Sequence, residues 1–211
     1  MALDLSNDEL LTTTRSVRKR LDFDRPVSRE LLMECLDIAL QAPSGSNAQG
    51  WQWIFVDDPD TKKALADIYR SNATGYLQLA PPERGDIRDQ QQAAVRDSAS
   101  YLNENFEKAP VLMIPCLEGR PDRAEAGMQA SYWGSLLPAV WSFMLAARAR
   151  GLGTCWTTLH LAFEQEAAEL LGIPYDQVTQ ALLTPLAYTK GTDFKPGDRK
   201  SHDGIVHWDT W

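Results

Sequence analysis

Residues 42–56 read APSGSNAQGWQWIFV. The first nine positions contain proline, glycine, serine and asparagine, which favour tight backbone turns. The next six, from Trp51 to Val56, are mostly aromatic or β-branched, a composition typical of a strand. Trp51 and Trp53 alternate with Gln52, so one of the two indoles is expected to face the core. The stretch therefore predicts a loop that leads directly into a strand.

Helices are predicted on both sides of this strand. Ser28 is placed to begin a helix whose apolar residues recur at helical spacing, and Pro43 is expected to end it. Asp58 and Pro59 open another helix that is expected to reach about Tyr69. The polar residues 71–92 predict a long mobile excursion, and with the helix expected near 93–106 they form a candidate lid over residues 71–106.

The N-terminal segment combines a capping box with a basic run. Ser6 and Glu9 have the spacing of a capping box, which predicts a short helix ending at Thr13 or Thr14. The sequence RSVRKR follows at residues 15–20 and is the densest basic segment of the chain. Such a run is most often a solvated face, so its position beside the helix matters more than its charge alone.

The longest helix is predicted over residues 124–150. Apolar residues, among them Met128, Trp133 and Trp141, encircle it instead of forming one stripe. A helix of this kind is buried on most sides, in a core or at a subunit interface. Pro138 is expected to kink it unless neighbouring groups compensate.

The remaining pattern predicts further strands and one more helix. These are a strand at 111–114, a strand at 154–158, a helix at 164–172, a strand at about 180–187 and a polar arm at 189–211. Helices mixed with separated strands, without repeats or a clear linker, predict a single domain over residues 1–211. The fold class expected is α+β, a three-layer α/β/α sandwich with a mixed, mostly antiparallel central sheet.

Composition excludes several functions. The net charge of −8 argues against nucleic acid as the main partner, because phosphate backbones need a basic surface. No stretch reaches 18 apolar residues, and the N-terminus lacks the pattern of a signal peptide, so a cytoplasmic protein without a membrane span is expected. Three well-separated cysteines favour reduced thiols, and Cys155 is expected to be a packing residue.

Several catalytic motifs are absent or incomplete. The sequence GLG at 151–153 follows a predicted helix and lacks the third glycine of a dinucleotide fingerprint, since Trp156 stands there. No GxxxxGK[ST], HExxH or GxSxG sequence occurs, and the three histidines stand alone. The sequence thus predicts no metal site and no dedicated nucleophile, and His160 is expected to be structural more often than substrate-binding.

Three segments in this order resemble the FMN-dependent nitroreductase family. They are RSVR at 15–18, APSGSNAQGW at 42–51 and GLGTCW at 151–156, with a weaker match at Arg199 and Lys200 near the end. The resemblance covers nearly the whole chain. This sequence departs from the family pattern at Gly50, where proline is frequent, and at Thr14, where many members have a second arginine.

The resemblance implies a set of cofactor-binding residues. Arginine and serine suit a phosphate and carbonyl oxygens, and in the family the second basic residue of the first motif, here Arg18, lies near the N1/C2 edge of the flavin. The second motif implies contacts made from the partner subunit, and the segment after Trp156, expected as a strand, implies backbone near flavin N5. The implied residues are Arg15, Ser16, Arg18, Pro43, Ser44, Gly45, Ser46, Asn47, Gln49, Thr157, Thr158, Leu159, Arg199 and Lys200.

The function implied is that of a homodimeric flavoenzyme with FMN at the subunit interface. NADH or NADPH would donate electrons in a ping-pong hydride transfer that reduces nitroaromatics, quinones or similar acceptors, with the chemistry carried by FMN N5. Two alternatives stay open. The same scaffold carries reductive dehalogenation and other specialised flavin reactions, and a non-catalytic flavin-binding protein would also fit the departures at Gly50 and Thr14.

Overall fold

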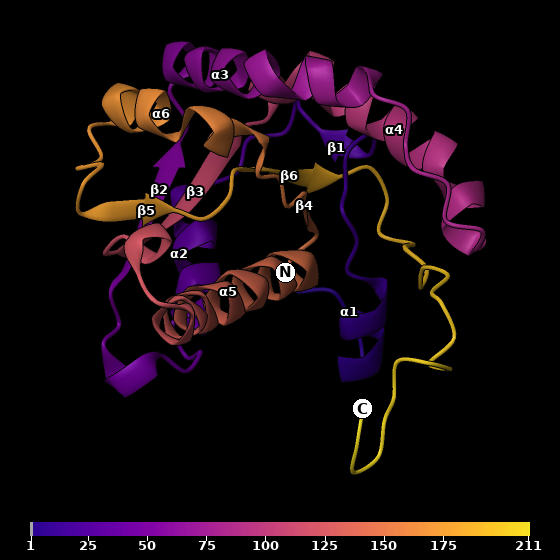
Figure 1. The fold of residues 1–211 in the computed structure, drawn as a ribbon. Coiled ribbons are helices and arrows are strands. Elements are labelled where there is room, and N and C mark those ends of the chain that lie inside the picture. Colours follow the sequence, from indigo (N-terminus) through magenta and orange to yellow (C-terminus); the bar gives the residue numbers. More distant parts are fainter. Residues whose placement is uncertain (1) are drawn as a thin grey trace.

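The computed structural model describes residues 2–211 and consists of one sheet with helices on both faces (Figure 1). The elements in chain order are α1 (Asn7–Thr13), β1 (Leu21–Asp22), α2 (Arg29–Ala39), η1 (Gly45–Asn47), β2 (Trp51–Val56), α3 (Pro59–Gln78), α4 (Ile87–Asn105), η2 (Phe106–Lys108), β3 (Val111–Glu118), η3 (Pro121–Arg123), α5 (Ala126–Ala149), β4 (Leu152–Thr154), η4 (Leu159–Phe163), α6 (Glu164–Leu171), β5 (Val178–Gln180) and β6 (Thr184–Thr189).

The central strand β3 organises the sheet. It pairs with β2 on one side and with β5 and β6 on the other, while β6 also pairs with β1 and β4. All of these strand pairs are antiparallel, and a parallel bridge joins Ser16 to Thr154. Seven of the eight residues of β3 are buried, as expected for a strand covered on both faces.

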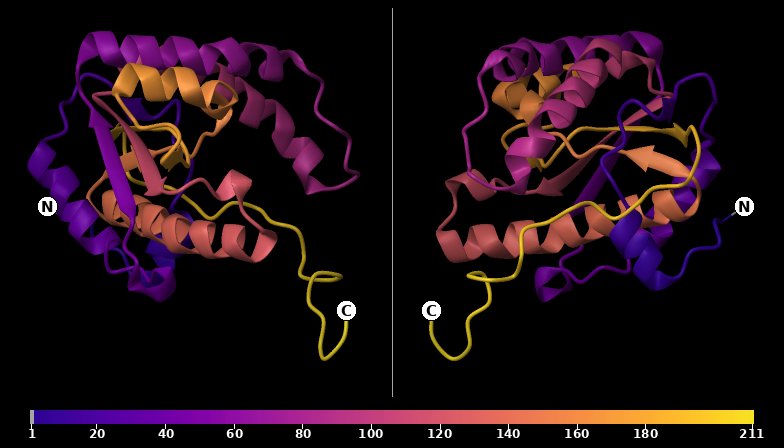
Figure 2. Two further views of the ribbon diagram at one scale, coloured as in Figure 1. Left: turned by 60° about the vertical axis from the view of Figure 1, so that its left-hand side comes forward. Right: turned by 90° about the vertical axis from the view of Figure 1, so that its right-hand side faces the viewer.

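The two faces of the sheet carry separate apolar cores. Helices α3, α4 and α6 lie on one face, and α2 and α5 lie on the other (Figures 1 and 2). The first core contains Leu65, Phe106 and Ile114, whereas the second contains Leu32 and Phe143. These layers confirm the predicted α+β class with a mostly antiparallel sheet flanked by helices.

The helix starts predicted from capping residues are confirmed. Ser6 and Glu9 form the complete capping box of α1, and the side chains of Ser28 and Asp58 accept backbone N–H groups at the starts of α2 and α3. The end of α2 was predicted too late, because the helix stops at Ala39, before Pro43.

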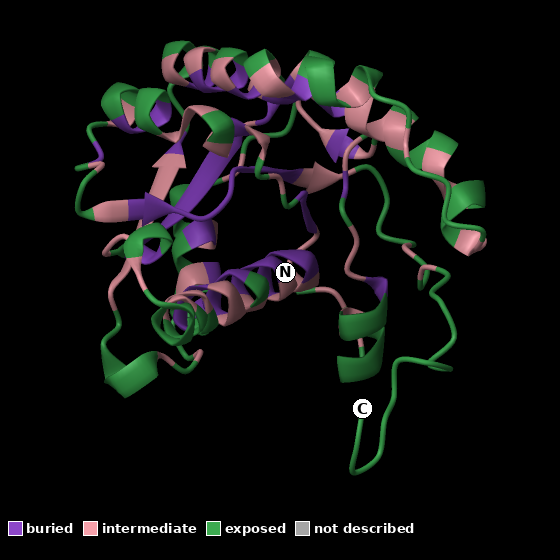
Figure 3. Ribbon diagram, in the orientation of Figure 1, coloured by how far each residue is buried: buried purple, intermediate pink, exposed green. Residues whose placement is uncertain are grey.

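The predicted excursion over residues 71–92 is wrong. Helix α3 continues to Gln78 and α4 begins at Ile87, so only residues 79–86 form the connection. The outer half of α4 is mostly exposed or half-buried, and the helix extends away from the sheet (Figure 3). Helices α3 and α4 are polar over most of their surface, and each packs through a narrow buried face that includes Ala73 in α3 and Leu102 in α4.

Helix α5 runs through Pro138 without interruption. The indole N–H of Trp51 donates to the carbonyl of Ser135 at 2.7 Å, next to the Gly134 carbonyl that the proline leaves without its helical donor. Trp53 packs against Phe143, which confirms the core role expected of one of the two indoles.

The segment after β4 differs from the prediction. A strand was expected at 154–158, but β4 ends at Thr154 and only Thr157 pairs further on, by two backbone hydrogen bonds with Leu183. Leu159 already belongs to the 3-10 helix η4. The predicted strand at 180–187 is likewise divided between β5 and β6.

The C-terminal arm, residues 190–211, has no helix or strand. It leaves β6, passes α1 and ends in a hook that stands clear of the other elements (Figure 2). In the part of the chain that the structure describes, no helix is long and apolar enough to cross a membrane.

Candidate functional site

The extended segment Arg15–Arg18 forms one wall of a hollow of 340 Å³. The amide of Val17 donates to the carbonyl of Thr154 at 2.8 Å, which fixes the segment alongside β4. Val17 is buried, and because neighbouring side chains of extended backbone point to opposite sides, Ser16 and Arg18 face away from the core. A Cβ at Gly153 would lie 2.9 Å from the Cβ of Val17, so this close approach requires glycine.

The hollow is lined by cationic, polar and apolar groups from five parts of the chain. The lining residues are Thr14, Arg15, Ser16, Arg18, Val95, Trp141, Met144, Thr154, Trp156 and Arg199. The two tryptophans and Met144 supply flat or pliable apolar surface, whereas the arginines supply charge. Trp141, Met144, Val95 and Trp156 were not predicted as site residues, because in the sequence they look like core residues.

The three arginines of the hollow are not neutralised within the chain. Across residues 2–211, no carboxylate lies within 4.0 Å of a guanidinium nitrogen of Arg15, Arg18 or Arg199. Arg18 donates to the hydroxyl of Ser98 on α4 at 3.3 Å. Three guanidinium groups without a carboxylate partner among residues 2–211 form a locally cationic surface in a chain of net charge −8, and such a surface suits an anion.

The other cations of the basic run point elsewhere. Lys19 forms an ion pair with Asp97, and Arg20 forms one with Asp193 at 2.5 Å. Lys200, predicted together with Arg199, does not belong to the residues that line the hollow. The structure thus separates Arg15, Arg18 and Arg199 from the remaining basic residues at either end of the chain.

Cys155 lies directly beneath this wall. Its thiol is fully buried, and burial raises its pKa, an effect that the nearby Arg18 guanidinium and the hydroxyl of Ser16 oppose. All three cysteines are buried and free, which confirms Cys155 as a packing residue.

The loop at residues 43–50 adopts a strained conformation away from the first hollow. Ser46, Asn47 and Gln49 all have positive φ, at 51°, 54° and 51°. Residues such as Ser46 and Gln49 cost about 1 kcal/mol or more each in this region, which asparagine adopts more readily, and such strain concentrates at functional sites. The Gln49 amide donates to Asn47 Oδ1 at 2.8 Å, so the two amide side chains support each other.

This loop lines a second hollow of 320 Å³ against the first half of α5. Its lining residues are Gly45, Ser46, Ala48, Gln49, Gly50, Leu117, Glu118, Met128, Ser131, Tyr132 and Ser135. The Ser135 hydroxyl accepts the amide of Gly45 at 2.8 Å, which holds the loop on the helix. The two hollows have no lining residue in common.

The two hollows lie on different faces of α5. At about 100° per residue, Met128 and Ser135 fall on one side of the helix, and Trp141 and Met144 fall roughly opposite. One chain therefore does not bring the 43–49 loop and the arginines into one cavity. The residues Thr157, Thr158 and Leu159 directly follow Trp156 but do not line the first hollow.

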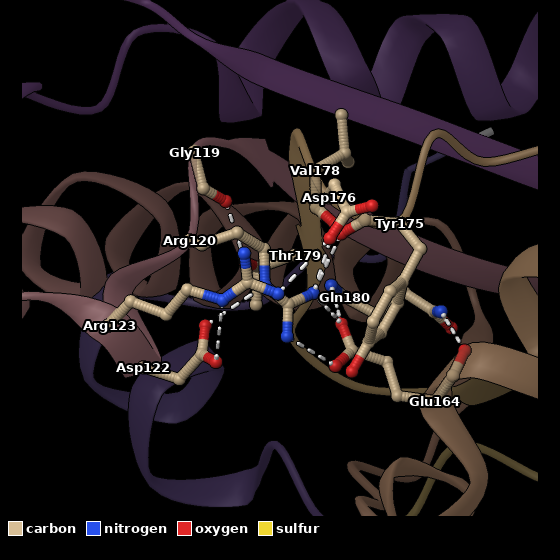
Figure 4. A network of polar contacts seen from close by, with 10 residues as sticks. All are labelled: Gly119, Arg120, Asp122, Arg123, Glu164, Tyr175, Asp176, Val178, Thr179 and Gln180. Atoms are coloured by element: carbon tan, nitrogen blue, oxygen red, sulfur yellow. Dashed lines mark hydrogen bonds and ion pairs between the residues drawn. The ribbon is translucent and has the colours of Figure 1, made fainter.

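A buried polar network lies where η4 ends and α6 begins (Figure 4). Arg120 and Glu164 form a bidentate ion pair with both N–O distances at 3.0 Å, and their side chains are 8% and 14% exposed. Glu164 also accepts the backbone amide of Gln180 at 2.9 Å. The arrangement links η3, α6 and β5.

His160 lies in η4 and is fully buried. Neither ring nitrogen has a hydrogen-bond partner within residues 2–211, and burial lowers the pKa of the imidazole to about 4, an effect that Gln180 opposes. A neutral, enclosed imidazole fits the structural role expected of it. Nowhere in residues 2–211 do three or more His, Cys, Asp or Glu side chains gather in a way that could hold a metal ion.

Comparison with known proteins gives the family. The sequence model of the Nitroreductase family matches residues 11–188, so the chain belongs to this family. The chain is 30% identical over 158 residues to a 5,6-dimethylbenzimidazole synthase of Rhodospirillum rubrum, covering 72% of this chain and 68% of that protein. It is 29% identical over 169 residues to a 4-nitrobenzoate reductase of Pseudomonas putida, covering 70% of each.

Among solved structures, the fold is similar to oxidised iodotyrosine deiodinase bound to FMN and 3-iodo-L-tyrosine. The TM-score is 0.73 at 24% identity, over 97% of this chain and 99% of the other. The family membership confirms the resemblance predicted from the three motifs and the expected class of oxidoreductase.

Proposed function

We propose that the protein is an FMN-dependent oxidoreductase that uses NAD(P)H to reduce nitroaromatic, quinone or similar organic acceptors. The observation that carries the proposal is the hollow lined by Arg15, Arg18 and Arg199, whose charges have no carboxylate partner in residues 2–211. A phosphate dianion on a flat, largely apolar ring system matches this combination of cations and aromatic walls.

The donor set fits FMN residue by residue. Arg15, Arg199 and the hydroxyl of Ser16 would hold the phosphate, because guanidinium groups bind phosphate oxygens in a bidentate manner. Arg18, held by Ser98, would stabilise the negative charge of the reduced ring. When bound, FMN accepts two electrons from NAD(P)H and returns them to an organic acceptor. Trp141 and Trp156 would supply apolar walls for the flavin ring.

We further propose that two copies of the chain complete each cofactor site. The Pro43–Gln49 loop and the arginines open into separate hollows on different faces of α5, so the loop reaches a cofactor only from a second copy. Exposed apolar side chains support a partner. Met128 is 55% exposed on α5, and Trp208 and Trp211 at the end of the arm are 84% and 101% exposed.

Thr157, Thr158 and Leu159 remain proposed neighbours of the ring through their backbone, as does Lys200 for the phosphate. Two backbone hydrogen bonds between Thr157 and Leu183 hold the segment, and the side-chain amide of Asn72 donates to the Leu159 carbonyl at 2.9 Å. The ping-pong order of the reaction and a cytoplasmic location are also proposals. Parallel double-reciprocal lines would support the first, and cell fractionation tests the second.

The visible spectrum of the purified protein tests the function directly. We expect a flavin spectrum with one FMN per chain, which loses its band near ~450 nm when NADPH is added without oxygen. A protein that stays colourless after FMN is added contradicts the cofactor assignment. Flavin that binds but is not reduced by NADPH or NADH would instead identify a non-catalytic flavin-binding protein.

Acceptor class and oligomeric state need separate measurements. Reduced protein mixed with a nitrobenzoate, a quinone and a halogenated phenol is expected to reoxidise fastest with the first two. Release of halide as the dominant reaction would favour the dehalogenase alternative. Light scattering after gel filtration is expected to give twice the chain mass of 23.6 kDa, and a monomer with bound FMN would contradict the shared site.

A further inference from the structure

Arg148 on α5 is a buried cation without a counter-ion. It is 3% exposed, and no carboxylate among residues 2–211 lies within 4.0 Å of its nitrogens. Its Nε and Nη1 atoms are buried without a hydrogen-bond partner in the same residues. Enclosing an unpaired charge is costly, and an apolar residue of similar volume would suit the fold alone at least as well. The position of this guanidinium therefore calls for another explanation.

The contacts that Arg148 does make join the two segments that deliver cations to the hollow. Its Nη2 donates to the hydroxyl of Thr13 at 3.3 Å, two residues before Arg15, and to the carbonyl of Thr192 in the C-terminal arm at 3.0 Å. The hollow itself begins one turn away on the same helix, at Met144.

Cation–π contacts also hold the arm near this guanidinium. The ring of Phe194 contacts two arginines, since the Cζ atoms of Arg20 and Arg148 lie 4.2 Å and 5.0 Å from its centroid. Arg20 also donates to the carbonyl of Lys190 at 2.9 Å. Gly191, with φ of 77°, allows the backbone to pass Arg20, since a Cβ there would lie 2.6 Å from Arg20 Nη2.

We propose that Arg148 is a positioning residue for the cofactor site, acting with Arg20 and Phe194 to fix the arm so that Arg199 reaches the hollow. The inference rests on the proposed FMN-binding function. Arg199 is five residues beyond Phe194, at most about 17 Å of chain, but ten residues beyond the end of β6, about 35 Å. Doubling a flexible tether lowers the local concentration of its end by roughly threefold.

The test compares FMN affinity with stability in the full chain. Arg148→Met removes the guanidinium but keeps an unbranched apolar side chain, and Phe194→Ala removes the ring from the other side. We expect each variant to raise the FMN dissociation constant by up to about threefold, without exceeding Arg199→Gln, because Arg20 still holds Lys190 and Asp193. The apo melting temperature of Arg148→Met is expected to stay level or rise, because the unpaired buried charge is gone.

The control and the double variant separate positioning from general damage. Arg150→Met is the matched control, since Arg150 is the C-cap residue of the same helix but pairs with Glu34 and makes no hydrogen bond or ion pair with the arm. In an Arg199→Gln background, Arg148→Met should no longer change FMN affinity. Unchanged affinity in both single variants, or an equal loss with and without Arg199, overturns the inference.

A second readout does not depend on FMN. Hydrogen exchange of amides 190–199 in the apo protein should be faster in Arg148→Met and Phe194→Ala than in the wild type and in Arg150→Met. If the wild type binds no FMN, the proposed function fails, and exchange still decides whether Arg148 anchors the arm. Equal exchange rates in all four proteins would show that it does not.

Discussion

Removing the carboxylate of Glu164 is predicted to destabilise the fold strongly for a polar residue. In Glu164→Ala, Arg120 stays 8% exposed but loses both bidentate bonds, and the amide of Gln180 loses its acceptor. Breaking a buried ion pair from one side costs about 3–5 kcal/mol. Arg120 keeps a 3.0 Å contact with Asp122, which is half exposed, so we expect the lower end, about 3 kcal/mol.

Urea and thermal unfolding of the apo protein measure this cost. For a chain of 211 residues, about 3 kcal/mol corresponds to a fall in melting temperature of roughly 6–12 °C. Glu169→Ala on the same helix is the matched control. Glu169 is exposed and its side chain accepts one hydrogen bond, from Gln165 at 3.1 Å, so its variant should change stability by less than about 0.5 kcal/mol.

A double-mutant cycle decides whether the cost belongs to the pair. Arg120→Met with Glu164→Ala should lose clearly less stability than the sum of the single variants, because the double variant leaves no unpaired buried charge. A cost below about 1 kcal/mol for Glu164→Ala, or strictly additive costs, would refute the reasoning and place the pair with ordinary surface ion pairs.

Three further predictions concern the site and its support. Arg18→Ala should weaken FMN binding by about 1–3 kcal/mol in a fluorescence titration. Arg29 pairs with Asp57 on the surface, so Arg29→Ala is the control and should leave the affinity unchanged. Equal FMN affinity in both variants would remove Arg18 from the site. Burial lowers the pKa of His160 from 6.5 to about 4, so between these pH values the unfolded chain binds a proton that the folded chain does not. The free energy of unfolding therefore falls as the pH drops through this window, by up to about 3 kcal/mol. The loss should shrink in His160→Gln, and the same pH dependence in both proteins would contradict the prediction. Gly153→Ala should cost about 1–3 kcal/mol in thermal unfolding because the new methyl group meets Val17, and a neutral result would show that the segment shifts freely.

The sequence predicts the apolar and capped elements best. Strand β2 has the predicted bounds, and the capping residues Ser6, Ser28 and Asp58 mark helix starts, because both signals depend on local chemistry. The helices over residues 71–105 were missed in part because their buried face is narrow and their other positions are polar. The strand expected after Thr154 is absent because its extent depends on pairing with β6, and that pairing ends where Thr154 lies opposite Leu186.

In the candidate site, too, the sequence predicts the features that depend on local chemistry and misses those that depend on tertiary contacts. The basic run indicates a charged surface, but only tertiary contacts distinguish Arg15 and Arg18, which line the hollow, from Arg20, whose charge is taken up by Asp193. Trp141 has no sequence signal that separates it from core residues, and Trp156 closes the GLGTCW motif but was not predicted to line the site. The strain at Ser46, Asn47 and Gln49 is equally hidden, because left-handed backbone at these residue types cannot be inferred from composition.

The placement of the two hollows on different faces of α5 has a genetic consequence. Under the proposed dimer, loss-of-function substitutions fall into two groups, those at the arginines and those in the 43–49 loop. A mixed dimer of Arg18→Ala and Gln49→Ala chains carries both defects at one site and neither at the other. Two inactive variants should therefore restore each other when they are refolded together, whereas two variants of the same group should not.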